Sequence, residues 1–116
     1  MLNKLIGGSS ISPQSITRLQ HTPAANTNAV NSIVANAAQR FIVHGIQWSY
    51  SAAPTNGRLT VSDGTTRVDL DITAAGPGAI SCAIPCDYGA ALTITLAAGG
   101  GTVVGKLSSQ VVIETA

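Results

Sequence analysis

Apolar and polar residues alternate with a period of two along most of the chain after residue 27. This is the period of a β-strand, in which successive side chains point to opposite faces of a sheet. The longest alternating run, 40–50, has apolar side chains on both faces, as is typical of a central strand covered on both sides. Its predicted faces are Ile42, His44, Ile46, Trp48 and Tyr50 on one side, and Phe41, Val43, Gly45, Gln47 and Ser49 on the other.

The runs 58–63 and 67–73 alternate in the same way, and Asp63-Gly64 stands between them. A tight hairpin turn requires a positive φ, which glycine adopts without strain. The sequence therefore predicts a β-hairpin at this point. Its inward residues are Leu59 and Val61 on the first strand and Val68, Leu70 and Ile72 on the second.

Further strands are predicted at 79–84, 91–96 and 102–115, separated by glycine-rich breaks. The segment 27–37 also fits a helical spacing, but its asparagine and β-branched residues favour a strand. Short strands with regular turn signals are typical of sandwiches, so we predict an all-β protein: an antiparallel β-sandwich or jelly roll of seven to eight strands. The residues predicted to face inward near the C-terminus are Leu92, Ile94, Leu96, Val103, Leu107, Val111 and Ile113.

Residues 1–27 differ from the rest, because Ser, Gln, Asn, Thr and Pro dominate and apolar side chains are scattered. Such a segment buries too little apolar surface to offset the entropy lost on ordering. We therefore expect an extended N-terminal arm over 1–27, with one short strand near 15–19, before a β-sandwich domain at 28–116. If this arm is ordered, we expect a neighbouring chain to hold it.

Charged side chains are scarce: they make up 9% of the 116 residues, against roughly a quarter in an average soluble domain. The net charge of +1 gives no basic tract for binding nucleic acid. No apolar run approaches the roughly 18 residues of a membrane span, and the N-terminus lacks a signal-peptide core. A surface so poor in charge is either rich in hydroxyl groups or covered by other molecules, which predicts self-association.

Histidine and cysteine give little support to a catalytic or metal site. His21 and His44 are the candidate bases, and neither stands beside a nucleophile-elbow sequence. Cys82 and Cys86 have a C-x₃-C spacing, which differs from the C-x-x-C spacing of redox and zinc sites. We expect two free, mostly buried thiols in a reducing cytosol, with a strained loop disulfide as the alternative.

Asp69 and Asp71 project from the same face of a predicted strand, and with Asp63 nearby they are candidates for a calcium or acid–base site. The loop pattern of a calcium site is absent, and charge pairing with Arg58 and Arg67 is the simpler role. An enzyme remains an alternative only if His44 lies beside these aspartates in an open cleft. We therefore predict a protein that is not an enzyme and has no cofactor or metal.

Four segments resemble small accessory proteins of tailed bacteriophages and prophages, of the kind called capsid decoration or cement proteins. They are RFIVHGIQWSYSAAP at 40–54, NGRLTVSDG at 56–64, DITAAGPG at 71–78 and LTITLAAGG at 92–100. The resemblance covers about 70 residues and rests on strand and turn patterns. It does not include the N-terminal arm, and the chain departs from it between Cys82 and Cys86.

The resemblance implies a structural component of the virion, assembled in the host cytoplasm. Its partners would be further copies of itself, with a trimer over a local three-fold axis expected, and the major capsid protein. No nucleic acid and no membrane would be bound. The residues expected to contact the capsid or a neighbouring subunit are Leu2, Ile6, Ile11 and Ile16 as apolar anchors, with Arg18 and Arg40 as charge partners.

The alternative function is a binding module on the virion surface or tail that recognises host glycans. Sugar sites need aromatic side chains on which a sugar ring can lie. The candidates for such a platform are Trp48, Tyr50 and Tyr88.

Overall fold

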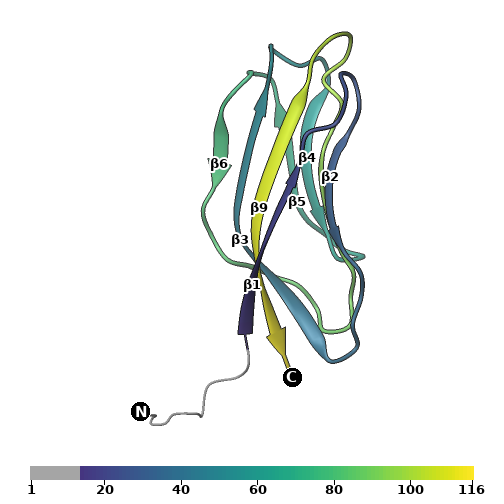
Figure 1. Cartoon of the computed structure of the whole chain (residues 1–116), viewed down its shortest axis with the longest axis vertical. Helices are drawn as coiled ribbons and strands as arrows, with labels where there is room; N and C mark the ends of the chain where they lie inside the picture. Colours follow the sequence, from purple (N-terminus) through teal and green to yellow (C-terminus); the bar gives the residue numbers. More distant parts are fainter. Residues whose placement is uncertain (1–13) are drawn as a thin grey trace.

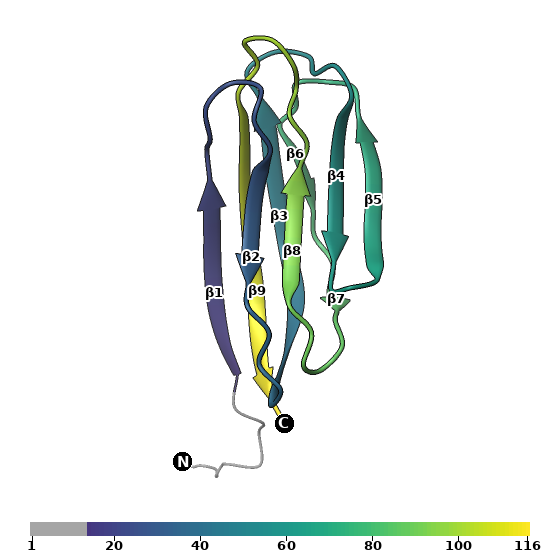
Figure 2. The ribbon, with the colours of Figure 1, turned by 90° about the vertical axis from the view of Figure 1, so that its right-hand side faces the viewer.

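A computed structural model describes residues 14–116, which form an antiparallel sandwich of two sheets (Figures 1 and 2). The β3 sheet has the order β1 (Gln14–His21), β9 (Gly105–Thr115), β3 (Gln39–Tyr50) and β6 (Gly78–Ile80), and β7 (Ile84–Pro85) also pairs with β3. The β4 sheet has the order β2 (Ala29–Ile33), β8 (Leu92–Leu96), β4 (Gly57–Ser62) and β5 (Thr66–Ile72). The predicted all-β sandwich is thus confirmed. The described residues contain no helix that could cross a membrane.

The predicted hairpin is formed by β4 and β5, which pair from Gly57 opposite Ile72 to Ser62 opposite Thr66. Gly64 lies in the connecting turn with a φ of 100°, a conformation that glycine adopts without a steric penalty. Leu59 and Val61 are fully buried, as predicted. The inward residues of β5 are less well covered, and Leu70 is 42% exposed because β5 is at the edge of its sheet.

A β-bulge in β3 changes which residues of this strand face the core. The register against β9 shifts between Val43 and Gly45, so that His44 has no partner residue in β9. A single extra residue exchanges the two faces of a strand beyond it. The prediction of two continuous faces along 40–50 is therefore wrong. The buried side chains of β3 are Phe41 and Val43 before the bulge and Ile46 and Tyr50 after it.

Three other predicted strands differ in their bounds from those observed. The run 79–84 is divided into β6 and β7, the last strand begins at Gly105, and the strand predicted in 27–37 is confined to Ala29–Ile33. The core between the sheets is aliphatic for the most part. Its fully buried large side chains are Phe41, Val43, Ile46, Leu59, Val61, Leu92, Ile94, Leu96, Leu107 and Val111.

The strand predicted near 15–19 is confirmed as β1, whose eight residues all pair with β9. The prediction that a neighbouring chain would hold this part of the arm is wrong, because its partner is a strand of the same chain. Side chains also connect β1 to β2 in the other sheet: the Val30 N–H donates to His21 Nδ1 at 2.8 Å, and Asn31 Nδ2 donates to the Leu19 carbonyl at 3.3 Å. The predicted arm residues Leu2, Ile6 and Ile11 lie outside the described residues.

Candidate interaction face

Four apolar residues form a continuous row across the outer face of the β3 sheet. Ile16 of β1 lies opposite Val112 of β9, Val112 lies opposite Ile42 of β3, and Ile42 lies opposite Pro85 of β7. Residues directly opposite one another in antiparallel strands project from the same face. We call these four residues the apolar ridge. Ile16 is 63% exposed, Pro85 is exposed, and Val112 and Ile42 are half-buried.

The ridge points away from the core of the sandwich. The alternate residues Val43 and Val111 are fully buried toward the β4 sheet, which covers only that side of the β3 sheet (Figure 2). Single exposed apolar residues are common on protein surfaces, but a contiguous row is typical of an interaction site. Full burial of one aliphatic side chain contributes about 1.5–3 kcal/mol. The ridge is therefore a source of binding free energy that the described residues leave unused.

One side of the ridge is bordered by a compact polar cluster. Arg40 Nε contacts Glu114 Oε1 at 2.5 Å, and the Tyr88 hydroxyl donates to the same oxygen at 3.3 Å. The guanidinium of Arg40 also lies 5.2 Å from the centroid of the Tyr88 ring, at a cation–π distance. The charge of Arg40 is thus balanced within the chain, so contact with a partner at this end of the ridge requires little desolvation of unpaired charge.

The other side of the ridge carries two basic residues and a shallow depression. Arg18 of β1 lies opposite Gln110 of β9, whose Nε2 donates to Gln47 Oε1 at 3.1 Å. Arg18 and Lys106 have no ion pair in the described part of the chain. The depression has a volume of about 220 Å³ and is lined by Gln47, Trp48, Ser49, Pro77, Lys106 and Ser108.

Three residues predicted as contacts, Ile16, Arg18 and Arg40, meet on this one face, whereas sequence reasoning missed Ile42, Val112 and Pro85. A signal for the missed residues was present. The run 40–50 has apolar residues on both faces, and one of those faces needs a partner outside the sandwich core.

The three aromatic residues predicted as a glycan platform do not lie on one surface. Tyr50 is 5% exposed and its hydroxyl donates to the Ala97 carbonyl at 2.6 Å, so it belongs to the core, where burial raises its pKa. Trp48 is half-buried over Gly78, where a Cβ would lie 2.5 Å from the indole. Tyr88 contacts Arg40, which is eight residues from Trp48 along β3, or about 26 Å in an extended strand.

The structure does not bring His44 beside the two aspartates of β5. His44 is exposed at the bulge of the β3 sheet, whereas Asp69 and Asp71 belong to the edge strand of the β4 sheet. Arg58 binds Asp69 through two hydrogen bonds of 2.7 and 2.5 Å, which confirms this predicted charge pair and lowers the pKa of Asp69. No group of three or more His, Cys, Asp or Glu residues within 14–116 could hold a metal ion.

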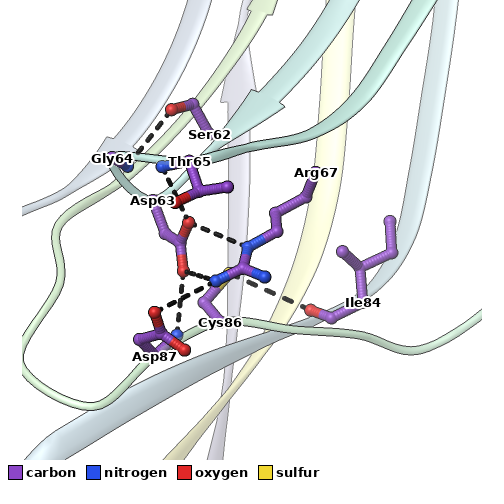
Figure 3. A network of polar contacts seen from close by, with 8 residues as sticks. All are labelled: Ser62, Asp63, Gly64, Thr65, Arg67, Ile84, Cys86 and Asp87. Carbon is purple, nitrogen blue, oxygen red and sulfur yellow. Dashed lines mark hydrogen bonds and ion pairs between the residues drawn. The ribbon is translucent and has the colours of Figure 1, made fainter.

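Arg67, the other predicted partner, binds Asp63 and not the aspartates of β5 (Figure 3). Its two hydrogen bonds to the Asp63 carboxylate, at 2.9 and 2.8 Å, hold the pKa of Asp63 well below its usual range. The Thr65 and Asp87 backbone N–H groups donate to the same carboxylate at 3.2 and 2.8 Å. Both carboxylate oxygens of Asp63 therefore accept hydrogen bonds, and these bonds connect the β4–β5 hairpin to the segment that follows β7.

Both cysteines are free, as expected. Cys86 is buried next to the Asp63 cluster, and desolvation raises the pKa of its thiol to about 11. The thiolate is the reactive form of cysteine, so Cys86 is inert at neutral pH. Cys82 is exposed, contrary to the prediction that both thiols are mostly buried.

No protein-family model matches the chain, and no curated protein is similar to it in sequence. Among solved structures, the chain is similar to the nucleoplasmin-like N-terminal domain of Drosophila FKBP39, with 10% identity, a TM-score of 0.51, and coverage of 89% of this chain and 91% of that one.

Two further structures resemble it more distantly. The CBM36-1 domain of a xylanase from the hindgut metagenome of Trinervitermes trinervoides has 11% identity, a TM-score of 0.43, and coverage of 90% and 98%. The virus-like particle of the Macrobrachium rosenbergii extra small virus has 12% identity, a TM-score of 0.37, and coverage of 96% and 86%. At such identities the likeness shows the sandwich fold alone, which is compatible with a structural or a binding role.

Proposed function

We propose that this protein is a non-enzymatic structural component of a tailed-bacteriophage particle, of the decoration or cement type. It docks on the major capsid protein through the outer face of the β3 sheet and stabilises the capsid lattice. The observation that carries this proposal is the apolar ridge, which crosses four strands and has no cover in the described residues. The sequence resemblance to accessory virion proteins supports it.

The chemistry of the face suits docking on a large protein lattice. Moving an unpaired ion out of water costs several kcal/mol, and beside the ridge Arg40 and Glu114 already neutralise one another. Burial of the ridge supplies free energy that offsets part of the entropy lost on association. On a lattice, many weak contacts act together because neighbouring sites raise the effective concentration.

The test uses shells of the major capsid protein from the same phage or prophage, prepared without this protein. Ile16→Lys and Pro85→Lys place a charge at either end of the ridge, at two exposed positions. Val34→Lys is the matched control, because Val34 is 84% exposed in the connection between β2 and β3, away from the face.

We expect the wild-type protein and Val34→Lys to co-sediment with shells and to raise the temperature at which shells come apart. Each ridge variant should bind about tenfold more weakly, which corresponds to about 1.4 kcal/mol. Equal resistance of shells to heat and low salt with and without the protein would contradict the proposal, as would ridge variants that bind like the wild type.

The depression beside Trp48 favours a second candidate, the binding of a neutral sugar of a host glycan. Its lining includes Trp48 and the polar residues Gln47, Ser49 and Lys106, and sugar sites combine aromatic and polar groups in this way. Because Trp48 is the single tryptophan, its fluorescence reports directly on this site. A saturable change on titration with oligosaccharides would support the candidate, and unchanged emission with unchanged acrylamide quenching would remove it.

A further inference from the structure

Two long strand edges are open in the sandwich. An open edge presents unpaired backbone N–H and C=O groups and can pair with a strand of another chain. The four edge positions in the described residues are β1 and β6 with β7 in one sheet, and β2 and β5 in the other. The strands β6 and β7 have only three and two residues, a length that limits pairing.

The edge of β2 is engaged by β1, since the Val30 N–H donates to His21. This leaves two strands with long open edges: β1, open over 14–18 because its residues from Leu19 to His21 contact β2, and β5, open over seven residues. Figure 2 shows them as the outermost strands on opposite sides of the sandwich.

The side chains on these two edges are complementary. Arg18 on β1 has no ion pair in the described part of the chain. Asp71 on β5 has none either, because Arg58, its neighbour in register, is bound to Asp69. One edge thus carries a cation without an ion pair, and the other a carboxylate that shares Arg58 with Asp69.

We propose that β1 of one copy pairs with β5 of a second copy, with Arg18 of the first copy against Asp71 of the second. The inference goes beyond the proposed function, because it concerns a contact between copies that needs no shell. Arg18 and Asp71 both project from the outer faces of their sheets, because they lie opposite the outward residues Gln110 and Arg58. When the outer faces of the two sheets lie on one side of a joined sheet, both side chains lie on that side.

The charges also select against the other pairings of edges. A two-fold contact of β1 with β1, or of β5 with β5, would place like charges across the contact, which is destabilising. A contact of β1 with β5 is head-to-tail and leaves one open edge of each kind free. It therefore continues from copy to copy as an open row.

The experiment reverses the two charges singly and together. In Arg18→Asp the two edges are both negative, and in Asp71→Arg they are both positive. The double variant exchanges the two charges and restores attraction. Lys106→Asp is the matched control, because Lys106 is another cation without an ion pair and lies on β9, away from either edge. Molar mass is measured by light scattering over a range of protein concentrations at low salt, and circular dichroism verifies that every variant is folded.

We expect the wild-type protein, the control and the double variant to self-associate. Each single variant should do so about tenfold more weakly. An equimolar mixture of the two single variants should associate, since opposite charges then meet between copies. A wild-type protein that stays monomeric, or a double variant and a mixture that stay as dissociated as the single variants, would overturn the proposal.

Failure of this inference is distinguishable from failure of the proposed function. Pro85 lies on the ridge at the far side of the sheet from β1, so Pro85→Lys should lose binding to shells and keep self-association. Asp71 lies on the other sheet, so Asp71→Arg should lose self-association while a single copy still docks on a shell. If Asp71→Arg self-associates like the wild type, the edge contact is wrong whatever the shells show.

Discussion

Asp63 is a carboxylate whose side chain has no exposed surface, and its two oxygens accept four hydrogen bonds. The donors come from the hairpin turn, from β5 and from the segment after β7, so one residue connects three parts of the chain (Figure 3). A buried charge is tolerated because every lone pair is satisfied. The sequence predicted Asp63 as a turn residue and as a candidate neighbour of Asp69 and Asp71. Its observed role could not be predicted, because the donors at 67 and 87 come together only through the fold.

Asp63→Asn should destabilise the protein by about 2 kcal/mol, because the amide cannot accept all four hydrogen bonds and leaves Arg67 without its counter-charge. The control is Asp69→Asn, which breaks a similar two-bond contact with Arg58 on the surface. Because exposed ion pairs contribute little to stability, the control should unfold at nearly the same urea concentration as the wild type. Urea unfolding measures both, and equal losses in the two variants would contradict the structural role of Asp63.

The pH dependence of stability follows from the lowered pKa of Asp63. Because the unfolded chain takes up a proton on this carboxyl at a higher pH than the folded chain, acid favours unfolding. The contribution is complete above the unfolded pKa of about 3.9 and declines as the pH falls below it. Urea midpoints from pH 7 to pH 2 should therefore converge for the wild type and Asp63→Asn, whereas a constant difference would show that the carboxyl is not the cause.

At the scale of elements, the bulge at His44 sets which side chains β3 gives to the core and which to the ridge. Without it, Phe41 and Val43 would share a face with Gly45 and Gln47, and Ile46 would point outward. Extra residues in a strand leave no signature in hydrophobic alternation when both faces are apolar. The pairing of β3 with β9 had to be known before the bulge could be recognised.

Deletion of His44 should be tolerated, because the buried residues on either side of it then alternate without interruption against β9. Deletion of Gln47, a residue exposed on the same strand, is the control. It forces either Ile46 or the pair Trp48 and Tyr50 off the core face. The His44 deletion should keep a cooperative thermal unfolding transition. The Gln47 deletion should have no such transition or a much lower midpoint temperature. A Gln47 deletion that is more stable than the His44 deletion would contradict the bulge.

At the scale of the whole molecule, a buried hydrogen bond joins the two sheets. Asn31 of β2 is 3% exposed, and its Nδ2 donates to Oγ of the fully buried Ser109 of β9 at 2.9 Å. The same amide nitrogen reaches the Leu19 carbonyl of β1. This contact helps to determine how the two sheets are placed, because a buried polar group is stable only in the arrangement that satisfies it.

Asn31→Ala should lower the free energy of unfolding by about 2 kcal/mol, since it leaves the Ser109 hydroxyl buried without this partner. Ser109→Ala alone should also lower the free energy of unfolding. The double variant should lose less than the sum of the two single variants, because residues that share a buried contact are coupled. A double-mutant cycle in urea measures the coupling, and strictly additive losses would show that the bond contributes nothing.

The sequence by itself determined the strand content, the β4–β5 hairpin and the sandwich class. These depend on alternation and turn chemistry, which are local properties of the chain. Only the tertiary structure decided that β1 pairs with β9 of the same chain, and that Tyr50 is buried while Tyr88 is exposed. It also decided which apolar residues form the ridge, namely Ile16, Ile42, Val112 and Pro85. The physical reason is that strand partners and register are fixed by contacts between residues far apart in sequence, and no local pattern encodes which strand ends at an edge.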